Sequence, residues 1–176
     1  MTPRKVTEEW VKEHLAKAEE MREQARAGAD EVFGGYFWYP RMLAETEGEP
    51  VQRFAKHYFD RDHAEYLRMV NPELAGEDHT RRLIAELLAE PEADSFLDAV
   101  LRMDQTTLIV DDPVKRVDNM TMAWGLEARV PFLDHQLVAL TAQCPPELKL
   151  KEGGKYPLKA MARGILPDAV IDRRKG

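Results

Sequence analysis

Prolines and glycines divide this chain into short segments, and most segments carry apolar residues at helical spacing. There are 11 prolines and 10 glycines among 176 residues. Leu83, Ile84 and Leu87, for example, recur as residues do on one face of an α-helix. A proline ends or opens such a helix because its ring fixes the backbone and removes the amide hydrogen. The pattern predicts helices over about residues 3–28, 50–58, 62–70, 80–90, 95–108, 113–125, 133–143 and 155–163.

Signs of β-structure are few. Apolar and polar residues alternate only briefly, at Leu148-Lys149-Leu150. Four aromatic residues, 36–39, follow the Gly34-Gly35 break and are stopped by Pro40, so no helix is assigned there. Pro113 is expected to begin or kink the helix that follows it. We therefore predict an all-α domain of about eight helices with short connections.

The composition limits the classes of partner. A net charge of −7 disfavours nucleic acid, whose phosphates require a basic surface. No apolar run approaches the roughly 18 residues of a membrane span. Cys144 is the only cysteine, so no intrachain disulfide can form. We expect Cys144 to be a packing residue. These features favour a cytoplasmic protein that binds neither nucleic acid nor membrane.

Three motifs stand out. Residues 111–134, the signature segment, read DDPVKRVDNMTMAWGLEARVPFLD. GADEVFGGY lies upstream at residues 28–36, and Gly-Gly-Lys lies downstream at residues 153–155. In this order they resemble the glutamine-dependent asparagine synthetase family, from about Gly28 to Gly176. We therefore expect two parts: an amphipathic helix over residues 1–27 that does not match the family, and a partial synthetase domain over residues 28–176.

The resemblance implies a fold and a reaction. The fold would be the helical C-terminal half of an adenine-nucleotide alpha-hydrolase-like synthetase domain, without most of its parallel sheet. The reaction would use ATP and Mg²⁺ to activate a carboxylate as an acyl-adenylate, which ammonia derived from glutamine then attacks. The partners would be this small-molecule carboxylate acceptor and ammonia or glutamine.

Gly28, Asp30 and Glu31 match the family's Gly-Ala-Asp-Glu element beside the adenylate pocket. By resemblance they bind substrate or ATP, and Asp30 is the candidate Mg²⁺ ligand, a role that a carboxylate can fill directly or through water. The alternative is that two acidic residues near a helix end are simply solvated.

By resemblance, the signature segment forms a wall of the active site. Asp118 is a candidate catalytic residue, although a structural role is about as well supported. Glu127, Arg129 and Asp134 are expected to give structural support: the first two as an ion pair that holds the turn, and Asp134 as the cap of the next helix.

Further basic candidates lie near the end of the sequence. Lys155 follows two glycines, which let a backbone approach a ligand closely. By resemblance it is a catalytic residue that also binds the phosphates, with Arg173 and Lys175 nearby. Taken alone, Lys155 is more typical of a lysine in a surface turn than of a ligand contact.

Two family elements are missing from the sequence. Ala25, Arg26 and Ala27 occupy the positions of the family's Ser-Gly-Glu, whose glutamate is implicated in handling the amine. The pyrophosphate loop, Ser-Gly-Gly-x-Asp-Ser, does not occur, and neither does the N-terminal cysteine of the glutaminase domain. We therefore expect little or no turnover by this chain alone.

Three hypotheses follow from these observations. The first is a synthetase fragment, with a subgroup resemblance to amidotransferases that form N-acetylglutaminylglutamine amide. The second is a non-catalytic helical module, in which an uncovered apolar face drives association, including a homo-oligomer. The third is the product of a reading frame that starts late in a longer gene.

Overall fold

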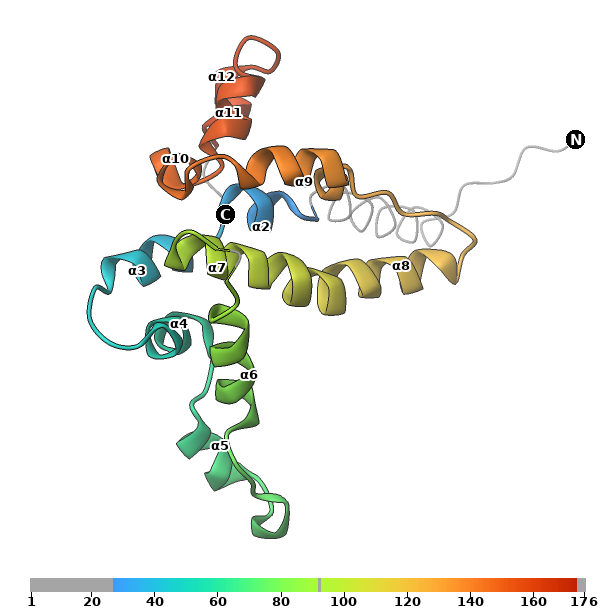
Figure 1. The fold of residues 1–176 in the computed structure, drawn as a ribbon. Helices are drawn as coiled ribbons and strands as arrows, with labels where there is room; N and C mark the ends of the chain where they lie inside the picture. Colours follow the sequence, from blue (N-terminus) through green and yellow to red (C-terminus); the bar gives the residue numbers. More distant parts are fainter. Residues whose placement is uncertain (1–26, 92, 174–176) are drawn as a thin grey trace, which may run out of the picture.

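The computed structural model describes residues 27–91 and 93–173, and this part is built from helices (Figure 1). It contains no β-strand, only an isolated bridge between Arg163 and Leu166. The all-α prediction is therefore confirmed, whereas the helix predicted over residues 3–28 lies almost wholly outside the described residues. The α-helices are α2 (Ala29–Phe33), α3 (Trp38–Ala44), α4 (Pro50–Tyr58), α5 (His63–Met69), α6 (His79–Leu88), α7 (Phe96–Met103), α8 (Lys115–Met122), α9 (His135–Ala142), α10 (Pro146–Leu150), α11 (Tyr156–Ala162) and α12 (Asp168–Ile171).

Shorter helical turns connect some of these helices. Two of them, η2 and η3, are π-helical, and the other three are 3₁₀ turns. The five are η1 (Pro72–Leu74), η2 (Asp104–Leu108), η3 (Val110–Val114), η4 (Pro131–Leu133) and η5 (Lys151–Gly153).

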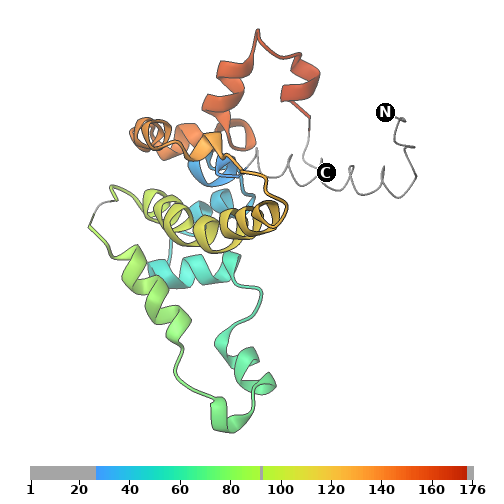
Figure 2. The same ribbon diagram turned by 90° about the vertical axis from the view of Figure 1, so that its right-hand side faces the viewer.

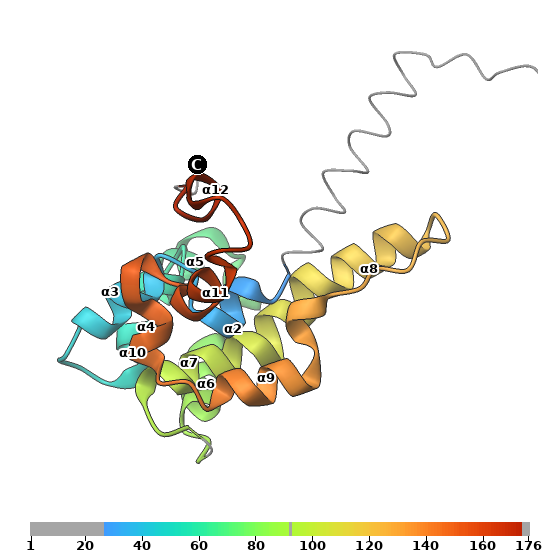
Figure 3. The same ribbon diagram turned by 90° about the horizontal axis from the view of Figure 1, so that it is seen from above.

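One long helical rod organises the structure. It runs from Phe96 through α7, η2, η3 and α8 to Met122, and its two ends are seen in line in Figures 1 and 3. The sequence predicts two helices here, whereas the structure joins them. Pro113 lies inside η3, where it has no amide hydrogen to donate. A π-helical turn is one way for a helix to continue past such a disturbance.

The other helices lie on two sides of the rod. In Figures 1 and 2, α5 and α6 extend to one side, and α9 to α12 lie on the other. Helix α6 packs against α4 and α7, while α2 packs against α9 and η4. Asp62, Asp78 and Ser95 each accept a backbone N–H at the start of α5, α6 and α7, as polar N-caps do.

The main core lies where α3 and α4 meet α7. Leu97, Val100 and Leu101 point inward as the helical spacing predicts. Tyr39 and Phe54, both with no exposed surface, complete the centre. Tyr39 belongs to the aromatic run that the sequence assigned to no helix.

Two local predictions are wrong. Pro40 does not stop a segment: it is the third residue of α3, in the first helical turn, where a missing amide hydrogen costs nothing. Leu148-Lys149-Leu150 is the end of α10, not a strand. Pro146 opens that helix at its first position, and this local signal outweighs a three-residue alternation.

Candidate functional site

Two glycines define the short helix that carries the candidate acids. Gly28 precedes α2 with φ 92°, and Gly34 follows it with φ 68°; both are left-handed. A Cβ on Gly28 would lie 2.5 Å from Leu133 Cδ2, so a side chain there would push α2 away from η4. Gly28 therefore allows α2 to pack closely against η4. Asp30 and Glu31 lie in the first turn of this helix, which has a left-handed glycine at each end.

Asp30 and Lys155 form the central contact of the site. Lys155 Nζ lies 2.9 Å from Asp30 Oδ1, and the exposed fractions of the two side chains are 25% and 14%. The backbone amide of Lys155 also donates to the carbonyl of Phe33 at 3.0 Å. Lys155 thus binds α2 through both its backbone and its side chain. The structure thus brings together one residue of the GADEVFGGY motif and one of the Gly-Gly-Lys motif.

Glycines make this close approach possible. A Cβ on Gly35 would lie 2.1 Å from both Asp30 Oδ1 and Lys155 Cε, directly in the ion pair. A Cβ on Gly154 would lie 2.3 Å from the carbonyl oxygen of Gly34. Gly35 and Gly154 are therefore packing features of the site as well as parts of chain breaks.

Gly35→Ala should break the Asp30–Lys155 pair selectively, because the new methyl group occupies the space between them. The backbone at Gly35 is not left-handed, so no conformational strain is added. We expect the free energy of unfolding in urea to fall by only about 1 kcal/mol, because the contacted atoms belong to flexible side chains that can move aside once the pair is broken. We also expect the NMR signal of the Lys155 ammonium group to move to the position of exposed lysines. Gly76→Ala is the control, since its Cβ would meet only His79 Nε2, at 3.8 Å; an equal effect of the two changes would contradict the assignment.

Glu31 belongs to a buried cluster. Its side chain accepts a hydrogen bond from the Tyr36 hydroxyl at 2.5 Å, and the residue is 2% exposed. On the rod, Asp104 is 1% exposed and accepts from the Tyr39 hydroxyl at 2.6 Å through Oδ2. Its other oxygen, Oδ1, has no hydrogen-bond partner in the described structure. We call Glu31, Tyr36, Tyr39, Tyr58 and Asp104 the acid–tyrosine cluster.

The acid–tyrosine cluster contains groups with strongly shifted pKa values. Burial raises the pKa of Asp104 to about 7; the neighbouring charge of Glu31 adds to the shift, and the hydrogen bond from Tyr39 opposes it. Burial and the same acids hold the pKa values of Tyr36, Tyr39 and Tyr58 above the ordinary tyrosine value. Sequence reasoning missed Asp104. The available signal was its position on the inward face of the 95–108 helix, where an acid is unusual.

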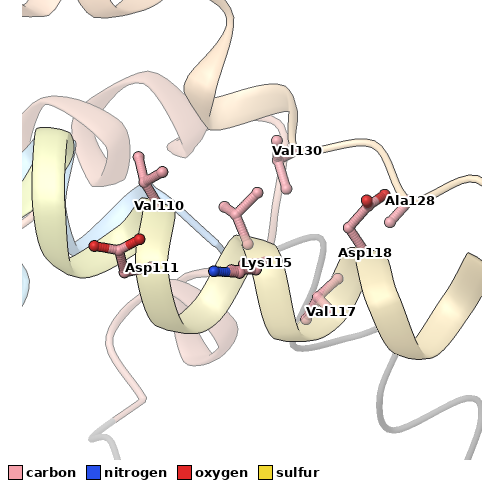
Figure 4. A pocket seen from close by; sticks show the side chains of 8 residues that line it. Val110, Asp111, Lys115, Val117, Asp118, Ala128 and Val130 are labelled. Atoms are coloured by element: carbon pink, nitrogen blue, oxygen red, sulfur yellow. The ribbon is translucent and has the colours of Figure 1, made fainter.

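Asp118 lies elsewhere. It lines a hollow of about 340 Å³ between α8 and the segment that returns along it (Figure 4). Lys115 and Asp111 supply the other charged groups, and neither Asp30 nor Lys155 reaches this hollow. Its lining is otherwise aliphatic: Val110, Val114, Val117, Ala128 and Val130. The structure therefore does not place the two candidate catalytic residues, Asp118 and Lys155, in one pocket.

The expected support residues occupy the turn after α8. Arg129 and Glu127 form an ion pair at 2.9 Å, with 82% and 69% of their side chains exposed. Such an exposed pair contributes little to stability. Asp134 Oδ1 accepts from the amides of Gln136 and Leu137 and caps α9.

Of the two basic candidates near the end of the sequence, Arg173 and Lys175, only Arg173 lies among the described residues. Arg173 is exposed just after α12, and that helix is tied to α11 by Arg163, which donates to Asp168 and Asp172. Lys175 lies outside the described residues. Neither is placed beside Lys155 by any contact in the part of the chain described, so their phosphate-binding role stays a prediction.

Comparison with known proteins identifies the family. A family model described as asparagine synthase matches residues 26–176. The chain belongs to the asparagine synthase family. Among its asparagine synthetase relatives, glutamine-hydrolyzing asparagine synthetase 1 of Bacillus subtilis is 34% identical over 185 residues, covering 84% of this chain and 29% of the relative. Asparagine synthetase 3 of the same organism is 29% identical over 157 residues, covering 84% of this chain and 24% of the relative.

The match covers only part of the length of the asparagine synthetases. A yeast relative, glutamine-hydrolyzing asparagine synthetase 1 of Saccharomyces cerevisiae, is 40% identical over 73 residues, which are 34% of this chain and 13% of the relative. The chain spans less than a third of the length of these curated relatives. No solved structure matches it. Among the described residues, no helix of this asparagine synthase family member is both long and apolar enough to cross a membrane.

Of the two ligands expected for an asparagine synthetase, ATP fits the described residues better than Mg²⁺ does. The Lys155 amine, a quarter exposed and fixed at its base, suits one phosphate oxygen of ATP. For Mg²⁺ the fit is poor, because no three His, Cys, Asp or Glu side chains gather as a metal site within residues 27–91 and 93–173. Asp30 is bound to Lys155, and the Glu31 side chain bonds to Tyr36. Asp30 as a Mg²⁺ ligand therefore stays a prediction that requires oxygen ligands from elsewhere.

Proposed function

We propose that this chain forms the helical side of an ATP-dependent amide-forming synthetase site, with Lys155 as its phosphate contact. The observation that carries the proposal is the Asp30–Lys155 pair, held at 2.9 Å in a glycine-lined corner. Membership of the asparagine synthase family supports the same assignment. The ammonium group is held before any ligand arrives, so little side-chain freedom is lost on binding.

In the proposed reaction, ATP activates a carboxylate as an acyl-adenylate and pyrophosphate leaves. Ammonia then attacks the activated carbonyl. Lys155 would bind a phosphate oxygen as a point charge and offset the negative charge of the leaving group. Asp30 would hold the amine in place between turnovers. The acceptor is a small carboxylate, either aspartate or the peptide carboxylate N-acetylglutaminylglutamine.

We propose that these 176 residues do not complete the reaction alone. Ser95 is the only serine in the sequence, so the Ser-Gly-Gly-x-Asp-Ser phosphate loop cannot be present. Without that loop, the phosphates would have Lys155 but no cradle of backbone amides. A second polypeptide or segment that provides the loop is the partner implied by this gap.

The test measures pyrophosphate binding and pyrophosphate release separately. By calorimetry, the chain should bind pyrophosphate weakly, and Lys155→Ala should weaken binding about tenfold, the equivalent of about 1.4 kcal/mol. Lys115→Ala, a lysine in the α8 hollow, is the control and should leave binding unchanged. With ATP, Mg²⁺, ammonium and either acceptor, the chain should release no pyrophosphate.

Two results would count against the proposal. Equal binding by the Lys155→Ala and original chains would remove Lys155 from the phosphate site. Release that depends on one acceptor would disprove the claim of inactivity, and it would also identify the substrate.

A second candidate function is a non-catalytic interaction module. Large apolar side chains are exposed on α8 and α9, including Met120 at 51%, Met122 at 55% and Leu140 at 66%. Exposed apolar surface of this kind is typical of association sites. Sedimentation equilibrium tests this function: self-association that Met122→Asp and Leu140→Asp weaken would support it, and a monomer at all concentrations would contradict a homo-oligomer.

A further inference from the structure

The short helix α2 needs partners for its last backbone carbonyls. In a continuing helix, the amide of Gly35 would bond to the carbonyl of Glu31. Here Gly35 donates instead to the carbonyl of Asp30, at 2.8 Å, because the chain turns at Gly34. The Glu31 carbonyl therefore loses its helical partner, and it belongs to a residue that is 2% exposed. A buried carbonyl without a partner is costly, so the fold must provide a donor from elsewhere.

Gln105 provides this donor from the rod. Its side-chain Nε2 donates to the Glu31 carbonyl oxygen at 3.1 Å, across a large distance in sequence. Gln105 belongs to the π-helical turn η2, in which the amide of Ile109 bonds back to the Asp104 carbonyl. Adjacent residues of this turn thus serve different partners, since Asp104 contacts Tyr39 while Gln105 contacts α2. A π-helical turn inside a helix often marks a functional position.

We propose that Gln105 is a positioning residue for the phosphate contact. By capping the carbonyl of Glu31, it fixes α2 against the rod and so fixes Asp30 where Lys155 can reach it. Lys155 holds the other side of the same helix end, through the Phe33 carbonyl and the Asp30 side chain. The site therefore depends on two supports of α2, one from η2 and one from the glycine turn before α11. This inference rests on the proposed role of Lys155 at phosphate.

The test replaces Gln105 with methionine in the full chain. Methionine keeps the length of the side chain but cannot donate a hydrogen bond. Gln143→Met is the matched control, because Gln143 Nε2 also donates to a backbone carbonyl, at 3.3 Å, but on the exposed surface of α9. Three properties are measured for each chain: the NMR signal of the Lys155 ammonium group, the affinity for inorganic pyrophosphate, and the urea midpoint of unfolding.

In Gln105→Met, the Lys155 ammonium signal should move toward that of exposed lysines, and pyrophosphate affinity should fall by less than the roughly tenfold loss expected for Lys155→Ala. Gln143→Met should leave both unchanged. Gln105→Asn keeps the amide on a shorter side chain and should give an intermediate result, which also provides a second variant if methionine prevents folding.

Two outcomes separate this inference from the proposed function. A lower urea midpoint with an unchanged ammonium signal and affinity would mean that Gln105 only supports the fold, which overturns the inference. If the original chain binds no pyrophosphate, the proposed phosphate contact fails. The ammonium signal would still decide whether Gln105 positions the Asp30–Lys155 pair.

Discussion

Asp104→Asn should remove the contribution that Asp104 makes to the pH dependence of stability between about pH 4 and pH 7. The pKa of Asp104 is raised from 3.8 to about 7 in the folded protein, chiefly by burial. The folded state therefore holds this proton more tightly than the unfolded state does. Its contribution to stability is complete below about pH 4 and is lost as the pH rises to about 7. The shift corresponds to roughly 4 kcal/mol as an upper figure.

The measurement is the free energy of urea unfolding from pH 4 to pH 8, in the original and variant chains. The quantity compared is the difference between the two chains, because other groups titrate equally in both. Asp112→Asn is the control: its carboxylate is largely exposed and pairs with Arg116 at 3.2 Å on the same rod. A difference for Asp104→Asn that stays constant over this pH range would show that the carboxyl titrates normally.

Gly154→Ala should have the second large effect, on both stability and the site. The added Cβ would lie 2.3 Å from the backbone oxygen of Gly34, which cannot move aside as a flexible side chain can. Gly154 also has φ 93° and ψ 163°, a region used almost only by glycine. We expect the free energy of unfolding to fall by about 3 kcal/mol or more. The Lys155 ammonium signal should also shift, since Gly154 precedes Lys155.

The adjacent glycine provides an internal control for this prediction. Gly153 has φ 81°, so alanine is strained there too, but no atom lies within 4 Å of its Cβ position. Gly153→Ala should therefore cost only about 1 kcal/mol, the conformational part of the penalty. Equal effects of the two substitutions would mean that backbone strain, and not the contact with Gly34, makes Gly154 necessary.

Sequence patterns predicted the helices well where the signal was local. Helices α5, α6 and α7 begin within about one residue of the predicted positions. Their N-caps, Asp62, Asp78 and Ser95, act on amides only two or three residues away, so the signal is local. Proline was harder to interpret. Pro40 and Pro113 both lie inside helical segments, one in a first turn and the other in a π-helical turn. Those contexts depend on neighbouring helices, which a single sequence does not specify.

The candidate site was predictable in part. Asp30 and Lys155 were named from separate motifs, and the structure places them in contact. Asp104 and Gln105 were missed, because their partners Tyr39 and Glu31 lie far away in sequence. Hydrogen bonds over such separations leave no periodic pattern. An acid on an apolar helical face was the one available sign.

The double attachment of Lys155 to α2 has a consequence for folding. Its two contacts join the beginning of the described chain to a turn near its end, so they close a loop that contains most of the described helices. Forming such contacts costs the conformational entropy that is lost when a long loop closes, and they therefore tend to form late. The Asp30–Lys155 pair should therefore be among the last contacts made during refolding, and its appearance would report the arrival of the complete native state.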